Sequence, residues 1–293
     1  MPVNRNPTVR QRRLARTLRE LRVGAGLTLL QVAQRLECAE SKISRIETAL
    51  SGVRPIDLRM MLDFYGVTNV ELRRELEELS RNARLRGWWD RYSDVLSPRY
   101  AQFISLEADA SKVRSMQTLL IPGLLQTEEY TRAVLRIQVE GATPAQIETH
   151  TQVRQERRSV LTRKPPLEMC VVLSERVLRH GVGGPDVMLQ QLEYLAAAAE
   201  SPNIEIRILP DESTIHAALL NPVTILSFPE SSETDVVYAD HLLGTIYFED
   251  PAEIDMYASL FRRASEEALS PEKSIALIER VSKEMGSHGK QLP

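Results

Sequence analysis

Hydrophobic and polar positions alternate with the period of an α-helix throughout the first 86 residues. Residues 9–23 place Leu14, Leu18 and Leu21 on one stripe and arginines on the others, as an amphipathic helix requires. Four more helices are predicted over residues 28–36, 40–49, 55–67 and 68–86. Three of these begin at a capping threonine or at a proline suited to a first helical turn. The pattern therefore predicts an all-α, five-helix N-terminal domain.

The pattern changes further along the chain. Residues 87–166 have helical periodicity, with a break at Ile121-Pro122-Gly123. Five short segments rich in β-branched residues then predict strands at 167–174, 204–209, 223–228, 235–240 and 245–250. A helix is predicted over 187–200, between the first two strands, and two more over 251–268 and 271–285. Because the last three strands follow at hairpin spacing, we expect an α+β domain with a mostly antiparallel sheet.

These patterns predict three parts of the chain. Residues 1–86 form a helical domain, residues 87–166 a helical connecting region that belongs to the following domain, and residues 167–293 an α+β effector or partner-binding domain. The length of 293 residues exceeds that of one typical domain, which agrees with this division.

Charge is distributed unevenly between these parts. Residues 1–60 contain twelve Arg or Lys against five Asp or Glu, a net charge of +7, so the remaining chain carries −10 of the total of −3. A basic N-terminal domain indicates a polyanionic partner such as DNA, whereas the acidic remainder is suited to another task.

Composition excludes other classes. The chain has no run of about 18 apolar residues and no apolar core of a signal peptide near its start, so we expect a cytoplasmic protein. Cys38 and Cys170 lie far apart within apolar patterns, which predicts buried free thiols and neither a disulfide nor a zinc site.

Residues 28–36 and 40–49 have the spacing of a helix-turn-helix. This motif requires a small residue where the helices cross, a tight turn, and apolar residues where the second helix packs on the first. Ala33 is the small residue and Leu36 shares its inner face, while Ile43 and Ile46 supply the packing contacts. In a basic, all-helical segment this spacing indicates a DNA-binding domain.

The stretch LTLLQVAQRLECAESKISRIETALSGVRPIDLRMMLDFYGV resembles the Xre, or phage-repressor-like, helix-turn-helix family. The motifs GWWDRY, LIPGLLQTEEYTRAVL, RQERRSVLT and VVYADHLLGTIYFED resemble the actinobacterial WhiJ-like regulators, which join an Xre domain to a large C-terminal domain. The resemblance covers about residues 10–280. It implies a transcriptional regulator, often encoded beside a small partner protein in an arrangement similar to toxin–antitoxin pairs.

Three positions depart from the Xre pattern. Leu29 stands where the family commonly has a DNA-contacting glutamine, and Ala39 where it usually has a capping serine. Glu37 stands where glycine is common because the turn tends towards positive φ, and we expect this to cost about 1 kcal/mol. None of the three removes the scaffold.

Roles follow from residue chemistry and position on the second helix of the motif. We expect the bases to be read by Glu40, Ser41, Ser44 and Arg45, with Arg45 donating to guanine and Glu40 accepting from cytosine. We expect phosphate contacts from Thr28, Gln31, Lys42 and Arg54. For each of these side chains, an ordinary solvated surface position is the alternative. The resemblance implies that Glu47 is structural and pairs with an arginine of the first helix, for which we take Arg19.

The remaining chain shows no catalytic or nucleotide-binding motif, so we expect neither an enzyme nor a bound cofactor. GVGGPDV joins two helices and is interpreted as a turn, and His180, His216 and His241 lack metal-ligand spacing. Two interpretations stay open: a domain that binds a small protein partner, or one that senses a metabolite in a pocket near Trp88, Trp89, Tyr92 and Tyr130. In both, we expect a homodimer on a pseudo-palindromic operator.

Overall fold

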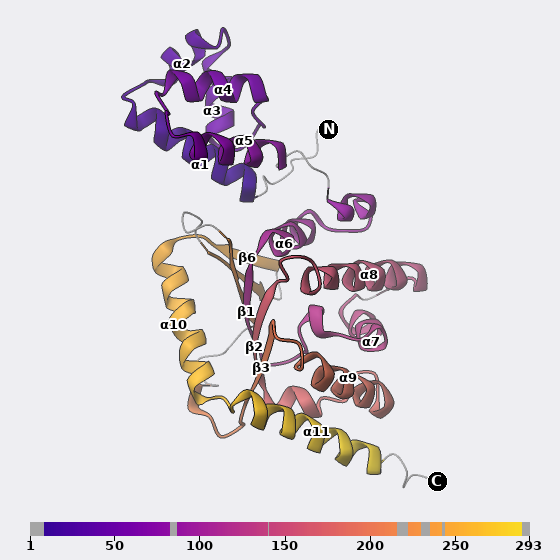
Figure 1. The fold of residues 1–293 in the computed structure, drawn as a ribbon. Helices are drawn as coiled ribbons and strands as arrows, with labels where there is room; N and C mark the ends of the chain where they lie inside the picture. The colour runs from indigo at the N-terminus through magenta and orange to yellow at the C-terminus, as the bar shows by residue number, and fades with distance from the viewer. Residues whose placement is uncertain are drawn as a thin grey trace. The chain divides into compact units, whose positions relative to one another are not determined.

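The computed structural model describes residues 9–82, 87–139, 141–215, 222–229, 235–241 and 244–288. The chain divides into two units (Figure 1). Unit 1 comprises Met1–Ser93 with Ser97–Leu106, and unit 2 comprises Asp94–Leu96 with Glu107–Pro293. The boundaries predicted from the sequence, after residues 86 and 166, stay predictions.

Unit 1 is built of helices. They are α1 (Val9–Gly24), α2 (Leu29–Arg35), α3 (Glu40–Glu47), α4 (Pro55–Phe64), α5 (Val70–Asn82), the 3₁₀ helix η1 (Trp88–Tyr92) and the first part of α6 (Pro98–Asp109). The first five match the predicted helices in order and approximate bounds. The prediction of five helices matches the unit only in part because η1 and α6 extend it. The predicted end of the fifth helix, at residues 83–86, lies outside the described residues.

One apolar core joins α1 to α5. Leu18, Ile43, Leu58, Met61 and Leu62 are fully buried in it. They come from α1, α3 and α4, which shows that the 3.6-residue periodicity of the sequence identified the inner faces. This packing fixes which face of α3 points outwards.

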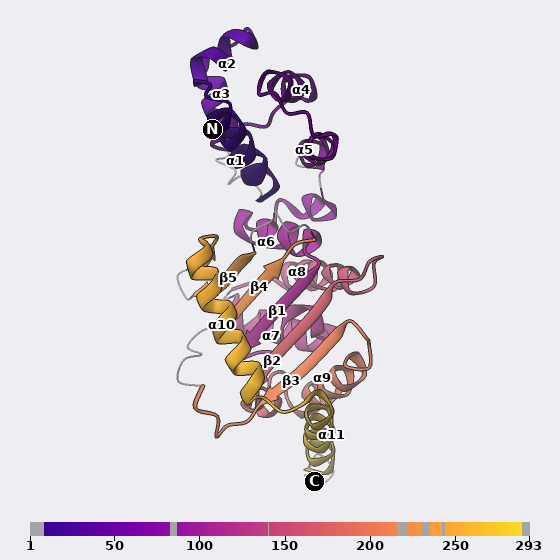
Figure 2. The same cartoon turned by 60° about the vertical axis from the view of Figure 1, so that its left-hand side comes forward.

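Unit 2 contains a mixed, six-stranded sheet in the order β3-β2-β1-β4-β5-β6 (Figure 2). The strands are β1 (Lys112–Gln117), β2 (Glu168–Ser174), β3 (Ile204–Leu209), β4 (Val223–Ser227), β5 (Val236–His241) and β6 (Gly244–Phe248). β1–β2 and β2–β3 pair parallel, whereas β1–β4, β4–β5 and β5–β6 pair antiparallel. The expectation of a mostly antiparallel sheet is therefore correct only for the half that follows β1.

The parallel half has a clear physical origin. Parallel neighbours need a long crossover, and helices α7 (Glu128–Gln138) and α8 (Pro144–Arg157) lie between β1 and β2, while α9 (Pro185–Ala198) lies between β2 and β3. The helix predicted over 187–200 corresponds to α9 in the second of these crossovers. Short 3₁₀ helices also lie in the connections of this unit: η2 (Gly123–Leu125), η3 (Arg158–Leu161) and η4 (Glu175–Arg179).

The sequence prediction was wrong for β1, which it assigned to a helical region. The stretch KVRSMQ has one β-branched residue, Val113, and is too short to show a clear period. It forms a strand because β2 and β4 pair with it on both sides, and Val113, Ser115 and Met116 are buried there. Tertiary pairing, not local preference, decides this element.

Helices cover both faces of the sheet. Figure 1 shows α10 (Pro251–Glu267) on one face and α7, α8 and α9 on the other. Ile254, Phe261 and Ala264 of α10 pack with Met116, Val223 and neighbouring strand residues in one apolar core. The last helix, α11 (Pro271–His288), packs against α9 and β3.

Candidate DNA-binding surface

The turn between α2 and α3 sets the angle of the helix-turn-helix. Ala33, Ile43 and Ile46 are buried where the helices meet, and Leu36 ends α2 beside them. Glu37 has φ of 50°, the left-handed conformation that favours glycine, as the sequence predicted. Its N–H donates to Gln34 O, and Cys38 N–H donates to Ala33 O at 2.9 Å, which forms a Schellman motif.

Glu47 is a buried structural residue, but its partner is Arg22 and not Arg19. Arg22 donates through Nε to Glu47 Oε1 at 2.7 Å and through Nη2 to Oε2 at 2.9 Å. Its Nη1 also donates to Leu27 O at 2.7 Å. The hydrogen bond to Glu47 raises the pKa of Arg22 above its ordinary value. Arg19 lies three residues earlier, on the exposed side of α1. The prediction that Arg19 pairs with Glu47 was therefore wrong by about one helical turn.

The outer face of α3 carries the four residues predicted to read bases. Glu40, Ser41 and Arg45 are exposed and Ser44 is half-buried. None of these four side chains has a hydrogen bond or ion pair to any residue that the structure describes. Ala39 caps the helix with extended backbone but no side-chain hydrogen bond. Among the described residues, nothing occupies the polar groups of this face.

Thr28 and Gln31 form a capping box at the start of α2. Thr28 Oγ1 accepts from Gln31 N at 3.2 Å, and Gln31 Oε1 accepts from Thr28 N at 2.8 Å. This arrangement fixes the exposed Gln31 side chain and leaves its Nε2 to donate elsewhere. Leu29, the residue that replaces the family glutamine, is half-buried and packs against the unit 1 core.

Lys42 and Arg54 share one acid that the sequence analysis overlooked. Asp57, buried at the start of α4, accepts from Lys42 Nζ at 2.7 Å and from Arg54 Nε at 3.0 Å and Nη2 at 2.9 Å. The bonds from Arg54 and then from Lys42 outweigh burial and lower the pKa of Asp57. The three side chains form one cluster of net charge +1 beside α3. The sequence feature that could have indicated this cluster is an acidic residue three positions after Arg54, near the predicted start of a helix.

The aromatic residues considered for a pocket fall in different units. Trp88, Trp89 and Tyr92 form edge-on contacts within η1 of unit 1. Tyr130 is completely buried in unit 2, where burial raises the pKa of its hydroxyl, which accepts from Ile121 N at 3.4 Å. Tyr130 is thus a core residue.

The structure also locates the remaining candidate ligand residues. His180 lies with Nδ1 3.0 Å from Leu119 O, His241 ends β5, and His216 lies outside the described residues. GVGGPDV leads from η4 into α9, with positive φ at Gly183 and Gly184. Across the described ranges, no group of three or more His, Cys, Asp or Glu side chains could hold a metal ion. In the same ranges, no helix is long and apolar enough to cross a membrane.

Comparison with known families agrees with this geometry. Residues 13–76, which span the α2–α3 motif and its supporting helices, match the model of a helix-turn-helix domain, a fold used to bind DNA. Residues 100–280 match the model described as a domain of unknown function, DUF5753, and the chain belongs to that family. Searches of curated proteins and of solved structures found no match.

Proposed function

We propose that this protein is a sequence-specific, DNA-binding transcriptional regulator. The observation that carries the proposal is the outer face of α3, where Glu40, Ser41, Ser44 and Arg45 have no partner among the described residues. The buried contacts of Ile43 and Ile46 on α2 aim this face outwards, as in proteins that place such a helix in the major groove.

The roles of the side chains divide by their surroundings. Arg45 is exposed and has no side-chain partner among the described residues, so its guanidinium is available to donate two hydrogen bonds to one guanine, and Glu40 can accept from cytosine. Lys42 and Arg54 are held at Asp57 with one uncompensated positive charge between them, which suits a phosphate better than a base. Thr28 and Gln31 complete the predicted phosphate contacts.

The C-terminal domain, in this proposal, controls DNA binding and has no enzymatic activity. The resemblance to WhiJ-like regulators and the acidic charge of this part of the chain support a small, basic protein partner, in an antitoxin-like, autoregulatory system. A metabolite-sensing domain is the second candidate. We also propose a homodimer, because two copies on a pseudo-palindrome bind more tightly than one copy on a half-site.

Selection of bound sequences from random DNA, with the full-length protein, tests the proposal. We expect enrichment of one motif with two-fold symmetry. Arg45→Ala should remove discrimination between the selected and random DNA, whereas Lys42→Ala should weaken binding to both alike and reduce the salt slope by about 1. Arg74→Ala is the matched control, since Arg74 is 82% exposed on α5 and pairs there with Glu78. If no motif is enriched, either with or without a small protein encoded nearby, the proposal of a sequence-specific regulator is refuted.

A second experiment distinguishes between the two candidate ways in which the C-terminal domain controls DNA binding. Co-purification of the full-length chain with a small protein, followed by a change in operator affinity, supports the partner. Thermal stabilisation by a metabolite pool without any protein partner supports the sensor.

A further inference from the structure

The surface of unit 2 is hollowed where the end of α8, η3, the end of α9 and the start of β3 meet. The hollow has a volume of about 460 Å³. Leu161, Ala198 and Ile204 supply apolar walls, and Gln155, Arg158 and Tyr194 supply the polar groups. No acidic residue lines it.

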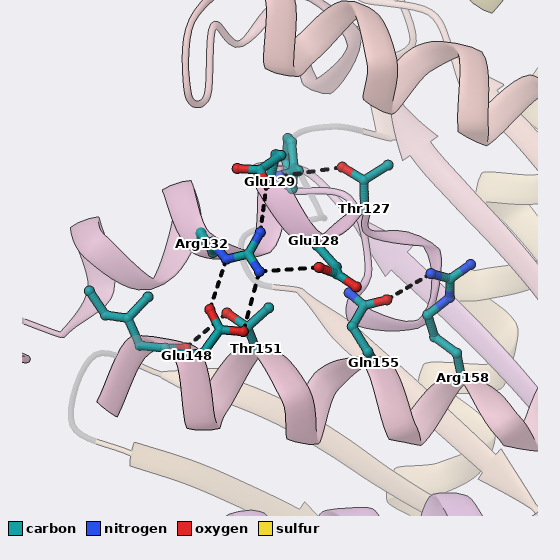
Figure 3. Close-up of polar contacts among 10 residues, drawn as sticks. Thr127, Glu128, Glu129, Arg132, Glu148, Thr151, Gln155 and Arg158 are labelled. Carbon is teal, nitrogen blue, oxygen red and sulfur yellow. Dashed lines mark hydrogen bonds and ion pairs between the residues drawn. The ribbon is translucent and has the colours of Figure 1, made fainter. Parts of the chain in front are cut away.

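Arg158 is held in place inside this hollow. Its Nη1 donates to Gln155 Oε1 at 2.7 Å, as Figure 3 shows, and its Nη2 donates to the Tyr194 hydroxyl. The guanidinium carbon also lies 4.6 Å from the centre of the Tyr194 ring, a cation–π contact. An arginine fixed by an amide, a phenol and a ring keeps its orientation without a counter-ion.

The charge of Arg158 is not neutralised by a carboxylate of the described residues, unlike the charges of Arg157 and Arg132. Arg157 is buried and forms a bidentate pair with Glu107, at 2.8 and 2.7 Å. Arg132, also drawn in Figure 3, contacts Glu128, Glu129 and Glu148. Arg158 has no carboxylate within ion-pair distance in the part of the chain that the structure describes.

Unused hydrogen-bond donors surround the same point. A guanidinium has five N–H groups, and two of the five in Arg158 have an acceptor among the described residues. Beside it, Gln155 Nε2 is buried and has no acceptor among the described residues. Free donors beside a fixed cation favour an acceptor of negative charge, because charge-assisted hydrogen bonds are the stronger ones, and no neighbouring side chain in the described residues provides such an acceptor.

We propose that this hollow binds a small organic anion, with its carboxylate or phosphate head on Arg158 and an apolar body against Leu161, Ala198 and Ile204. The carbonyl ends of α8 and α9 lie nearby and disfavour an anion slightly, by an effect that falls off within a turn. A direct charge-assisted pair with Arg158 is stronger than that effect. The site lies within unit 2 and does not depend on DNA binding by unit 1.

Calorimetric titration of the full-length protein tests the site, with benzoate as the carboxylate probe and phenyl phosphate as the phosphate probe, at constant ionic strength. For ligands of this size we expect saturable binding with a dissociation constant on the order of 1 mM for the preferred head group. Arg158→Met should weaken that binding at least tenfold, and Tyr194→Phe by a smaller factor because the ring contact remains.

Arg176→Met is the matched control, because Arg176 is exposed in the same unit and pairs with Asp211 at 3.2 Å. It removes the same charge and should leave the probe affinity unchanged. Circular dichroism and the melting temperature without probe establish that each variant is folded. Arg158→Lys, which keeps the charge but loses the fork of donors, should show intermediate affinity. Linear, non-saturating heat with both probes, or equal affinity of wild type and Arg158→Met, would overturn the proposal.

Discussion

Replacing Asp57 by asparagine separates the electrostatic part of DNA binding from fold stability. Asp57 is buried and accepts three hydrogen bonds from Lys42 and Arg54. The substitution is nearly isosteric, but it removes the negative charge that offsets one of the two cations. The cluster changes from a net charge of +1 to +2, at the edge of the surface that carries α3.

The substitution is expected to lower the stability of the fold and to strengthen binding to DNA phosphates. Loss of hydrogen bonds between charged groups at a buried carboxylate lowers the free energy of unfolding by about 1–3 kcal/mol. Meanwhile each added positive charge that neutralises a phosphate steepens the dependence of log K on log salt by about 0.9. We therefore expect a less stable protein that binds random DNA more tightly at low salt.

Fluorescence anisotropy with a random-sequence duplex, at several salt concentrations, measures the slope, and urea unfolding measures the stability. Asp63→Asn is the control: Asp63 lies at the other end of α4, is 64% exposed and pairs with Arg73. It makes the same charge change away from the candidate surface. A slope for Asp57→Asn that equals the wild type or the Asp63 control contradicts phosphate contact by Lys42 and Arg54.

Three further predictions concern unit 1. Glu47→Gln should lower its free energy of unfolding by about 3 kcal/mol, because Arg22, 12% exposed, loses the counter-ion that the structure shows for it. Glu78→Gln on the exposed pair of α5 should change the free energy of unfolding by less than about 0.5 kcal/mol. Urea titration followed by tryptophan fluorescence compares the two variants, and equal changes would refute the structural role of Glu47. Ala39→Ser should raise the free energy of unfolding by about 0.5–1 kcal/mol, seen as a higher urea midpoint, because the backbone at the N-cap is already extended. An unchanged midpoint would mean that the serine hydroxyl does not reach the backbone amide at position N3. Because the pKa of Asp57 is lowered in the folded state, its ionised carboxylate stabilises the fold above the unfolded pKa of about 3.9, and this stabilisation is lost as the pH falls through the folded pKa. The difference in free energy of unfolding between wild type and Asp57→Asn should therefore shrink below about pH 4. A difference that stays constant with pH would contradict the ion pairs.

Sequence periodicity was sufficient for α1 to α5 because these elements are local. Leu18, Ile43 and Leu58 each lie on an apolar stripe of one helix, and Thr28 with Gln31 marks a start that needs no tertiary information. The positive φ of Glu37 was implied by the resemblance to the Xre pattern, in which glycine is common at this turn.

The missed features depend on contacts between elements. Whether Arg19 or Arg22 reaches Glu47 depends on the angle between α1 and α3, and the role of Asp57 depends on Lys42, fifteen positions earlier on another helix. The hollow at Arg158 is formed by four separate elements, so no local pattern could indicate it.

The position of β1 has a consequence for how the chain acquires its structure during synthesis. Lys112 pairs with Glu168, 56 positions later, and with Ser227, 115 positions later. The central strand β1 therefore cannot complete its pairing until both β2 and β4 have been synthesised. The apolar core of α1 to α5 is formed by residues between Leu14 and Leu79, and local helical domains fold quickly and in N- to C-terminal order on the ribosome. A chain interrupted before Val223 thus carries a complete helix-turn-helix beside an unfinished sheet, and any experiment that begins the C-terminal domain after Gln117 removes the strand at its centre.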